Sequence, residues 1–308
     1  MSALRAFFIY LSQHRGMQRF VLRNPVARRA SRRFVAGETL AEGVAAVRAL
    51  NGLGIHASLN YLGEKTTSPA EAQEAANHYL EVLEAITLER LDCNLSIKLS
   101  QLGLASDAVL AERLLRRILE AADREGIFVR IDMEESALVD PTLALWRRVW
   151  GEGWSNVGLV IQSYLRRSEQ DLADLVETGV RIRLVKGAYL EPPAVAYPRK
   201  ADVDAAYRRL TDVLLHRGTY PAIATHDPRM IAYARAVAAG EGIGPERFEF
   251  QMIYGVRRDL QAALVRQGYH VRVYVPFGEQ WYPYFMRRLG ERPANVLFLL
   301  RSVFAEWR

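Results

Sequence analysis

The sequence has a single cysteine, few histidines and no long uncharged apolar run. Cys93 has no partner for an internal disulfide or for a cysteine-based metal site, and this favours a reducing compartment, with the cytoplasm as the expected location. The longest apolar stretch, residues 43–63, is interrupted by Arg48, so no segment is predicted to span a bilayer. With 50% hydrophobic and 25% charged residues, the composition excludes a disordered or collagen-like chain and predicts a large core.

Acidic residues are missing from the first 37 positions, which contain eight arginines. The remainder carries 33 basic and 35 acidic residues and is nearly neutral, so it lacks the broad basic face of a nucleic-acid-binding protein. Apolar residues such as Leu4, Phe7 and Phe8 alternate with the arginines. Three interpretations stay open for this segment: helices packed on the main domain, an amphipathic surface for anionic lipid, or a transit peptide. We expect an arginine-rich helical segment over 1–37 and a catalytic domain over 38–308.

Eight short apolar runs rich in β-forming residues recur along the chain, with helical stretches between them. About thirty residues per unit is the size of the repeat in a (βα)8 barrel, so the sequence predicts an α/β fold of the TIM-barrel type. The expected strands are Ile55–Leu62, Leu95–Leu99, Ile127–Met133, Val157–Tyr164, Val180–Val185, Tyr220–Thr225, Phe248–Ile253 and Tyr269–Val275.

Helix signals support this alternation. The pairs Ser68-Pro69, Asp140-Pro141 and Asp227-Pro228 each place a capping residue before a proline, an arrangement typical of a helix N-terminus. One glycine pattern, at residues 52–57, resembles a dinucleotide-binding motif. Because a predicted helix, Leu40–Leu50, precedes it and a strand follows it, these glycines are expected to end the helix and not to bind a nucleotide.

Seven of the eight predicted strands carry polar residues at or just after their C-terminal ends, where barrel enzymes place their chemistry. Charged side chains are seldom buried without a partner, so this concentration predicts an active site. The residues are Lys98, Asp132, Gln162, Arg183, Lys186, Thr225, His226, Gln251 and Tyr274.

Two local patterns add to this site. Residues 183–189 run from an alternating strand into a small-residue turn, where backbone N–H groups can approach a large anionic ligand such as a pyrophosphate. Near the C-terminus, Tyr284, Arg287, Arg288 and Glu291 are spaced to share one helical face. Paired guanidinium groups on such a face suit a carboxylate, although adjacent arginines also occur on solvated helices.

Other chemistries fit parts of this pattern. A Schiff-base aldolase would use Lys98 or Lys186 as its nucleophile, and a noncatalytic membrane- or RNA-binding protein would use the arginine-rich segment. A metal hydrolase would need Asp132, Glu134 and His226, but no second histidine stands at ligand spacing, so no metal site is expected.

Residues 40–308 resemble the proline dehydrogenase family, near its short monofunctional bacterial branch. The resemblance rests on several motifs taken together, which are the Arg-Leu-Val-Lys-Gly-Ala-Tyr run at 183–189, Ala224-Thr225-His226, the 284–291 pattern, Ser96-Ile97-Lys98-Leu99-Ser100 and Arg130-Ile131-Asp132-Met133-Glu134. It implies a distorted (βα)8 barrel with a final helix over the barrel mouth. It also implies noncovalent FAD, oxidation of L-proline to Δ1-pyrroline-5-carboxylate and transfer of electrons to a membrane quinone.

The resemblance also implies roles for individual residues. Asp132 and Arg183 would be catalytic, and Asp132 would orient Lys98. The substrate would meet Lys98, Tyr189, Tyr274, Tyr284, Arg287, Arg288 and Glu291. The flavin would meet Met133, Gln162, Arg183, Lys186, Gly187, Ala188, Thr225, His226 and Gln251.

The sequence departs from the family after Tyr189, where Leu190-Glu191-Pro192-Pro193 replaces a loop that carries an aromatic residue in many members. This departure affects the expected outer wall of the flavin pocket. No aldehyde dehydrogenase domain is expected after residue 308, so the product would pass to a separate pyrroline-5-carboxylate dehydrogenase. No nucleic-acid partner is expected, and contact of the protein with the inner face of an anionic membrane is left open.

Overall fold

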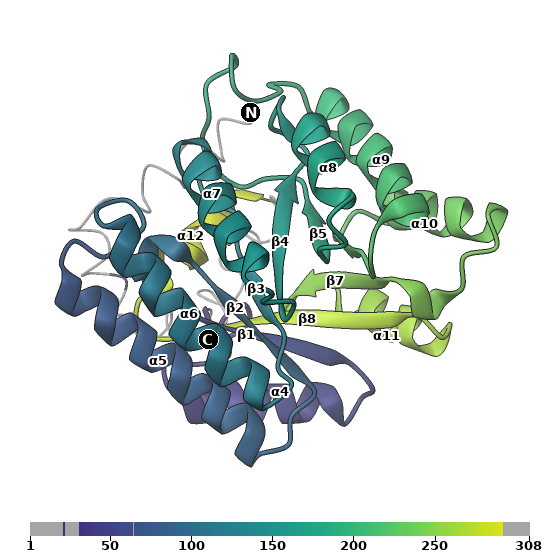
Figure 1. Ribbon diagram of the computed structural model, residues 1–308. Coiled ribbons are helices and arrows are strands. Elements are labelled where there is room, and N and C mark those ends of the chain that lie inside the picture. Colours follow the sequence, from purple (N-terminus) through teal and green to yellow (C-terminus); the bar gives the residue numbers. More distant parts are fainter. Residues whose placement is uncertain (1–20, 22–30, 64, 292–308) are drawn as a thin grey trace.

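In the computed structural model, which describes residues 21, 31–63 and 65–291, eight parallel strands form a closed barrel in sequence order (Figure 1). Strand β1 pairs with both β2 and β8, and this double pairing closes the barrel. The strands are β1 His56–Tyr61, β2 Cys93–Ile97, β3 Val129–Ile131, β4 Val157–Gln162, β5 Ile182–Val185, β6 Ala222–Ala224, β7 Glu249–Ile253 and β8 His270–Phe277. The predicted TIM-barrel fold is therefore confirmed.

The helices between successive strands cover the outside of the barrel, a further helix precedes β1, and another follows β8 (Figure 1). They are α4 Leu40–Asn51, α5 Pro69–Leu88, α6 Ala108–Arg124, α7 Val139–Gly151, α8 Ser168–Val176, α9 Lys200–Arg217, α10 Pro228–Gly240, α11 Arg258–Arg266 and α12 Trp281–Glu291. Short 3₁₀ turns, η1 Leu99–Leu102, η2 Ser136–Leu138 and η3 Pro245–Arg247, lie between these elements. The large apolar core lies between the outward-facing strand residues and the helices.

Local capping sets several helix starts. The Ser68 side chain accepts a hydrogen bond from the Glu71 N–H, and Glu71 bonds back to the Ser68 backbone, so α5 begins with a complete capping box. Asp227 caps α10 as expected. The predicted cap at Asp140 is wrong, because α7 continues directly from η2 and begins at Val139. Asp140 lies instead in the first helical turn, where its carboxylate pairs with Arg167 at 2.6 Å.

The barrel interior is unusually polar. Strand residues alternate in direction, so every second residue points inward, and in most barrels of this type these are branched apolar residues. Here the buried residues of the interior include Ser58, Asn60, Ser96, Arg130, Arg183, Glu249, Gln251 and Arg272. Because the helices already supply the apolar core on the outside, the interior is available for a charged network.

The predicted final helix lies over the barrel mouth, as expected. Helix α12 packs against Leu62 after β1, Ile253 at the end of β7 and Tyr274 on β8, and the first two lie at the C-terminal ends of their strands. Residues 34 and 35 complete this second apolar cluster, and the Trp281 indole N–H donates to Glu38 at 3.0 Å. Most of the segment 1–37 lies outside the described residues, so its helical content and the domain boundary stay predictions.

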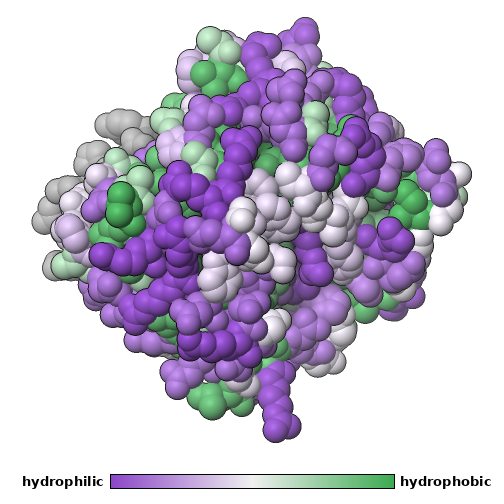
Figure 2. Space-filling model, viewed as in Figure 1, coloured by the Kyte–Doolittle hydropathy of each residue, from purple (hydrophilic) through white to green (hydrophobic). Residues whose placement is uncertain are grey.

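The face seen in Figure 2 is mostly hydrophilic, with small separate apolar areas. Exposed large apolar residues in the described part of the chain are scattered, as at Leu53, Leu88 and Val109. Within residues 31–63 and 65–291, no helix combines the length and the hydrophobicity that a bilayer crossing requires.

Phe34→Ala is expected to lower the free energy of unfolding by about 3 kcal/mol, because the Phe34 ring is only 1% exposed and packs against Phe285 of α12. Leu53→Ala, at a side chain that is 68% exposed, is the control and should change stability by less than about 0.5 kcal/mol. Denaturant titration measures both. Equal, small effects would mean that residues 31–38 do not hold α12.

Candidate active site

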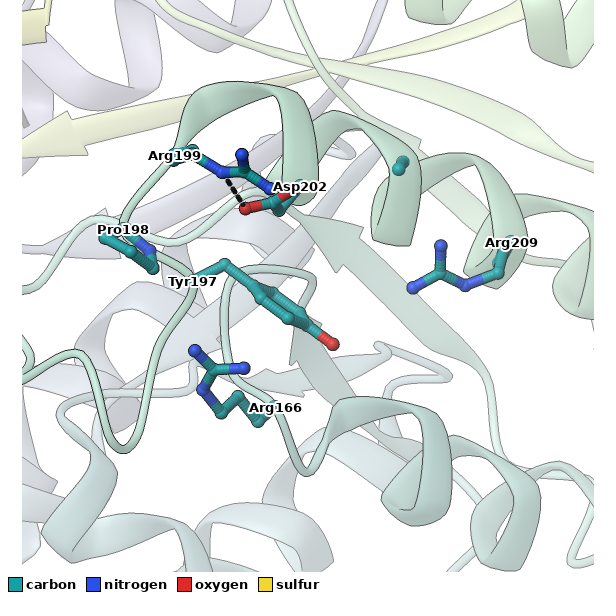
Figure 3. Close-up of a pocket in the computed structure, with 7 residues that line it drawn as sticks. Arg166, Tyr197, Pro198, Arg199, Asp202 and Arg209 are labelled. Atoms are coloured by element: carbon teal, nitrogen blue, oxygen red, sulfur yellow. Dashed lines mark hydrogen bonds and ion pairs between the residues drawn. The ribbon is translucent and has the colours of Figure 1, made fainter.

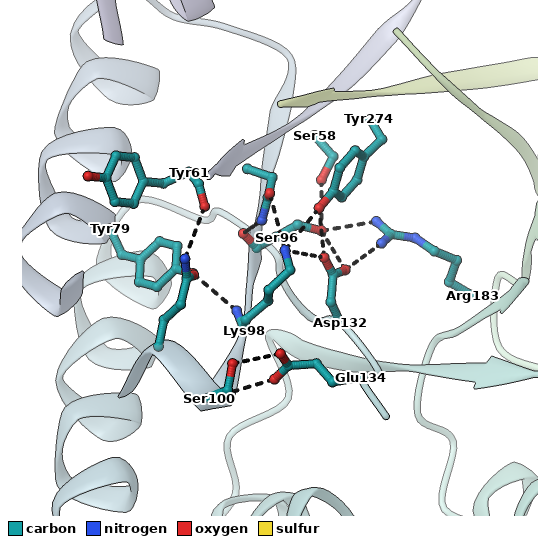
Figure 4. A network of polar contacts seen from close by, with 12 residues as sticks. Ser58, Tyr61, Tyr79, Ser96, Lys98, Ser100, Asp132, Glu134, Arg183 and Tyr274 are labelled. Carbon is teal, nitrogen blue, oxygen red and sulfur yellow. Dashed lines mark hydrogen bonds and ion pairs between the residues drawn. The ribbon is translucent and has the colours of Figure 1, made fainter. Parts of the chain in front are cut away.

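Asp132 is the centre of the polar network at the C-terminal ends of the strands (Figure 4). It lies one residue past β3, and its carboxylate accepts hydrogen bonds from four side chains. Arg183 Nη1 and Tyr274 Oη lie 2.8 Å from its two oxygens, and Ser96 Oγ and Lys98 Nζ lie at 3.3 and 3.4 Å. The structure thus brings together Lys98, Asp132, Arg183 and Tyr274, four of the residues predicted for the site.

Tyr274 acts as a hydroxyl donor in this network. Burial and the charge of Asp132 raise the pKa of Tyr274 well above its usual value, so the phenol stays protonated. Its oxygen also lies 3.4 Å from Lys98 Nζ. The Arg183 guanidinium lies over the Tyr274 ring at 5.6 Å, so one cation and one carboxylate fix this ring from two sides.

Asn60, which was not predicted for the site, lies on β1 and is fully buried. Its amide oxygen accepts from Lys98 Nζ at 3.3 Å, and its amide nitrogen donates to the Ser96 carbonyl at 3.1 Å. Tyr79 of α5 was also missed, and its hydroxyl accepts from the Lys98 backbone N–H at 3.1 Å. A polar residue at an inward position of a predicted strand is the signal that would have identified Asn60.

Glu134 forms a second buried contact beside Lys98 (Figure 4). Its two carboxylate oxygens accept from the Ser100 hydroxyl at 2.6 Å and from the Ser100 backbone N–H at 3.1 Å, and they fix the turn that follows Lys98. Burial raises the pKa of Glu134, although these two hydrogen bonds act against the shift. Gln162, at the end of β4, donates to the Glu134 carbonyl at 2.9 Å, and Met133, which precedes Glu134, is buried.

A chain of hydrogen bonds continues from Arg183 through the barrel interior. Arg183 Nε donates to Gln251 Oε1 at 2.5 Å, and the Gln251 amide nitrogen donates to Glu249. Glu249 in turn accepts from Arg272 Nε, with both oxygens at 3.1 Å. Burial alone would raise the pKa of Glu249, but the Arg272 charge lowers it, so the carboxylate is ionised. This chain orients Gln251 and thereby Arg183.

Lys186 follows β5 and lies between two carboxylates. Its ammonium group is 2.6 Å from Asp204 Oδ1 and 2.9 Å from Asp227 Oδ2. Burial would raise the pKa of Asp227, but Lys186 and the Arg229 backbone N–H lower it to about 2. The group is therefore charged at neutral pH, next to the N-terminus of α10. Neither Asp204 nor Asp227 was predicted for the site, because they follow in later helical segments.

The turn after Lys186 requires glycine. Gly187 has a φ of +108°, a backbone conformation that residues with a Cβ rarely adopt, and a Cβ built there would lie 2.1 Å from Tyr164 Cδ1. Ala188 and Tyr189 follow, both half-buried. Burial and the charge of Glu134 raise the pKa of Tyr189, and Arg287 of α12 acts in the opposite direction. The Tyr189 hydroxyl is therefore within electrostatic range of both Glu134 and Arg287.

Strand β6 contributes Thr225 and His226. The Thr225 hydroxyl accepts from the Asp227 N–H at 3.1 Å. The Ile253 backbone N–H donates to His226 Nε2 at 2.8 Å, so this nitrogen carries the lone pair and the ring is in the Nδ1–H tautomer. A metal hydrolase would use Asp132, Glu134 and His226 together. In this structure each of these three residues bonds to different partners.

Helix α12 carries the predicted arginine pair. Arg288 is buried and its guanidinium lies over the Tyr284 ring at 5.1 Å, whereas Arg287 is half-buried. Tyr284 belongs to the same apolar cluster as Tyr274, which donates to Asp132. The helix therefore places this face next to the Asp132 network. The Glu291 side chain lies outside the described residues, so its predicted role stays a prediction.

A surface depression of about 470 Å³ lies away from this network, between α9 and the loop that precedes it (Figure 3). Its cations are largely neutralised, since Arg199 pairs with Asp202 and Arg209 with Glu169. Arg166 lies over the Tyr197 ring and donates to the Pro193 carbonyl. We assign no catalytic role to this depression.

The fold and this polar network define a (βα)8-barrel enzyme. The proline dehydrogenase family model matches residues 44–301. Proline dehydrogenase from Deinococcus radiodurans is 46% identical over 275 residues, which are 88% of this chain and 89% of the relative. Proline dehydrogenase 1 of Bacillus subtilis is 40% identical over 300 residues, which cover 97% and 99% of the two chains. This chain therefore belongs to the proline dehydrogenase family.

A solved structure supports the same assignment. Proline utilization A (PutA) from Bdellovibrio bacteriovorus superposes with a TM-score of 0.81 at 26% identity. The alignment covers 85% of this chain but only 32% of that protein. The chain therefore spans about a third of the solved PutA chain, whereas it matches its monofunctional relatives over nearly their whole length.

Proposed function

We propose that this enzyme oxidises L-proline to Δ1-pyrroline-5-carboxylate with noncovalently bound FAD, and that the electrons pass on to a membrane quinone. The membership in the proline dehydrogenase family supports proline as the substrate. The observation that carries the proposal is the position of the α12 arginine pair beside the network of Lys98, Asp132 and Arg183.

The residues at the C-terminal ends of β4 to β7 fit FAD. The cofactor would supply a two-electron acceptor at its N5 atom, to which a hydride from proline C5 is transferred. Lys186, which Asp204 and Asp227 hold after β5, and the turn at Gly187 would contact the cofactor. Arg183, which Asp132 and Gln251 hold, would stabilise negative charge on the ring system. Met133, Gln162, Ala188, Thr225 and His226 complete the proposed cofactor contacts.

The substrate contacts follow from the charges of proline. Arg287 and Arg288 would bind its planar carboxylate through two guanidinium groups, with Lys98 beside them. Tyr189, Tyr274 and Tyr284 would surround the apolar ring, and Glu291 would hold one of the arginines. Asp132 acts in this scheme by fixing Lys98, Arg183 and Tyr274 before the substrate enters, because it bonds to all three.

The proposed partners of the enzyme follow from the proposed reaction. The product would leave for a separate pyrroline-5-carboxylate dehydrogenase, and the quinone would be reached from the cytoplasmic side of the membrane. The arginine-rich residues 1–37 are the proposed contact with anionic lipid. No nucleic acid is involved in this scheme.

A visible spectrum of the purified protein tests the function directly. Flavin bands near ~450 nm should be present and should bleach when proline is added without oxygen, because the oxidised ring system gives these bands. Alanine of equal concentration is the control and should leave the spectrum unchanged. A colourless protein that borohydride traps on an added carbonyl substrate would instead support the aldolase alternative.

Gly187→Val is expected to give folded protein with little or no flavin. A valine at φ +108° is strained, and its side chain would displace the Tyr164 ring that packs against this turn. Gly153→Val is the matched control, since Gly153 also has a positive φ but nothing lies near its Cβ position. Absorbance ratios at the flavin and protein bands give the cofactor content. Normal flavin content in the Gly187 variant would remove this turn from the cofactor site.

A further inference from the structure

Arg130 is the one buried arginine of the described barrel interior that has no carboxylate partner. It is 3% exposed and points inward from β3, two residues before Asp132. Its Nη1 donates to the carbonyls of Leu159 at 2.9 Å and of Arg181 at 2.5 Å, its guanidinium lies over the Phe128 ring at 4.9 Å, and its Nε has no hydrogen-bond partner. By contrast, Arg183 pairs with Asp132 and Arg272 pairs with Glu249.

The Arg130 side chain fits because the neighbouring position on β4 has no side chain. Gly158 on β4 lies opposite Arg130 in the strand register. A Cβ at residue 158 would lie 2.7 Å from Arg130 Nη1, 2.6 Å from Phe128 Cζ and 2.5 Å from the Arg181 carbonyl oxygen. Glycine in a strand interior weakens a sheet and marks a place of close approach. The fold therefore accommodates a buried arginine in a position that an apolar pair could fill.

Burial of an unpaired charge is unfavourable. Burial and the nearby charge of Arg183 lower the pKa of Arg130, although the charges of Glu249 and Asp132 act against the shift. An arginine nevertheless keeps its proton in proteins, so the positive charge persists. The carbonyl of Arg181 already accepts from the Leu159 N–H at 3.2 Å, so the sheet does not need Arg130 to satisfy it. A costly buried charge that the sheet does not require points to a role in function.

We propose that Arg130 is an electrostatic tuning residue of the active site, whose unbalanced positive charge favours negative charge at the barrel mouth and thereby raises the reduction potential of the bound flavin. This inference rests on the proposed function. Arg130 touches neither substrate nor cofactor in this scheme and acts through the buried interior, where charges are screened much less than at the surface. Asp132 and Arg183 lie between it and the mouth, and their charges cancel.

Arg130→Met tests the inference on the flavin-loaded protein, with sulfite as the probe. Sulfite adds to N5 of oxidised flavins and leaves negative charge on the ring, so its dissociation constant reports the electrostatic field. We expect the dissociation constant to rise at least tenfold in Arg130→Met, which corresponds to about 30 mV in a two-electron potential. Arg130→Gln removes the charge but keeps a donor for the carbonyls, and it should give the same change. Arg181→Met is the control, because Arg181 is exposed and its charge is screened.

Thermal melting separates tuning from a structural role. If Arg130 serves the site, Arg130→Met should melt at the wild-type temperature or above it, because an unpaired buried charge has been removed. An unchanged sulfite dissociation constant in the Met and Gln variants, with flavin still bound, would overturn the inference and leave the proposed function intact. If the melting temperature falls while sulfite binding is unchanged, the role of Arg130 is to stabilise the contact between β3 and β5. Wild-type protein that neither contains nor takes up FAD would overturn the proposed function itself.

Discussion

Arg288→Lys is expected to raise the KM for proline roughly a hundredfold while the flavin content stays normal. A carboxylate held by a planar guanidinium accepts two parallel hydrogen bonds, and lysine offers only a point charge. Loss of one charge-assisted bond in a buried site costs up to ~3 kcal/mol, which is a factor of about one hundred in binding. Arg288 is buried and stacked on Tyr284, so a lysine would also lose this contact. Steady-state kinetics with proline and a soluble dye acceptor measure the change.

The control for this prediction is Arg147→Lys, because Arg147 and Arg148 form another adjacent pair, exposed on α7. It should leave KM and kcat within experimental error. An unchanged KM in the Arg288 variant would mean that the α12 pair does not bind the proline carboxylate, and the proposed orientation of the substrate would then have to be reversed.

Asp132→Asn should lower kcat/KM by about a thousandfold. The carboxylate accepts from Arg183 and Tyr274 at 2.8 Å, and Lys98 lies 3.4 Å away. An asparagine has a single oxygen, so its amide N–H₂ would face one of these donors. Removing one member of a buried ion pair typically costs about 3–5 kcal/mol of free energy. If this cost raises the activation free energy, it accounts for the expected thousandfold loss in kcat/KM.

Asp92→Asn is a control of the same chemical change at the opposite end of the barrel. Asp92 also has a close side-chain partner, His56 Nδ1 at 2.5 Å from Asp92 Oδ2, but it is more exposed and precedes β2. It should lower stability and leave kcat/KM within about twofold. If both variants lost activity to the same extent, the effect of Asp132→Asn would reflect the stability of the barrel and not the site.

The positions of the strands and of the charged residues at their ends could be predicted because both follow from local patterns. Eight apolar runs at regular spacing require a closed sheet, and Lys98, Asp132 and Arg183 stand where those runs stop. Their mutual contacts depend on register, which brings Asn60 opposite Ser96 and Arg183 opposite Ala222. The sequence indicated the members of the site but not these pairings.

The residues that were missed lack a local signal. Asn60 and Tyr79 lie within an expected strand and helix, and only the closed barrel shows that they contact Lys98. The cap at Asp140 was wrong because the preceding turn, η2, leads into the helix and makes a capping side chain unnecessary. The partners of Lys186 come from elements that follow it in the chain, so no motif contains the cluster.

The contact between Phe34 and α12 also has a consequence for folding. Phe34 and Phe285 lie about 250 residues apart in the sequence, and their ring centroids are 6.2 Å apart. During synthesis Phe34 can therefore contact Phe285 only after almost the whole barrel has been made, since such long-range contacts form late. A nascent chain that ends before Trp281 can pair its strands but has no arginine pair for the substrate. If the α12 arginine pair binds the proline carboxylate as proposed, proline binding would appear only on molecules in which these two distant segments are already in contact.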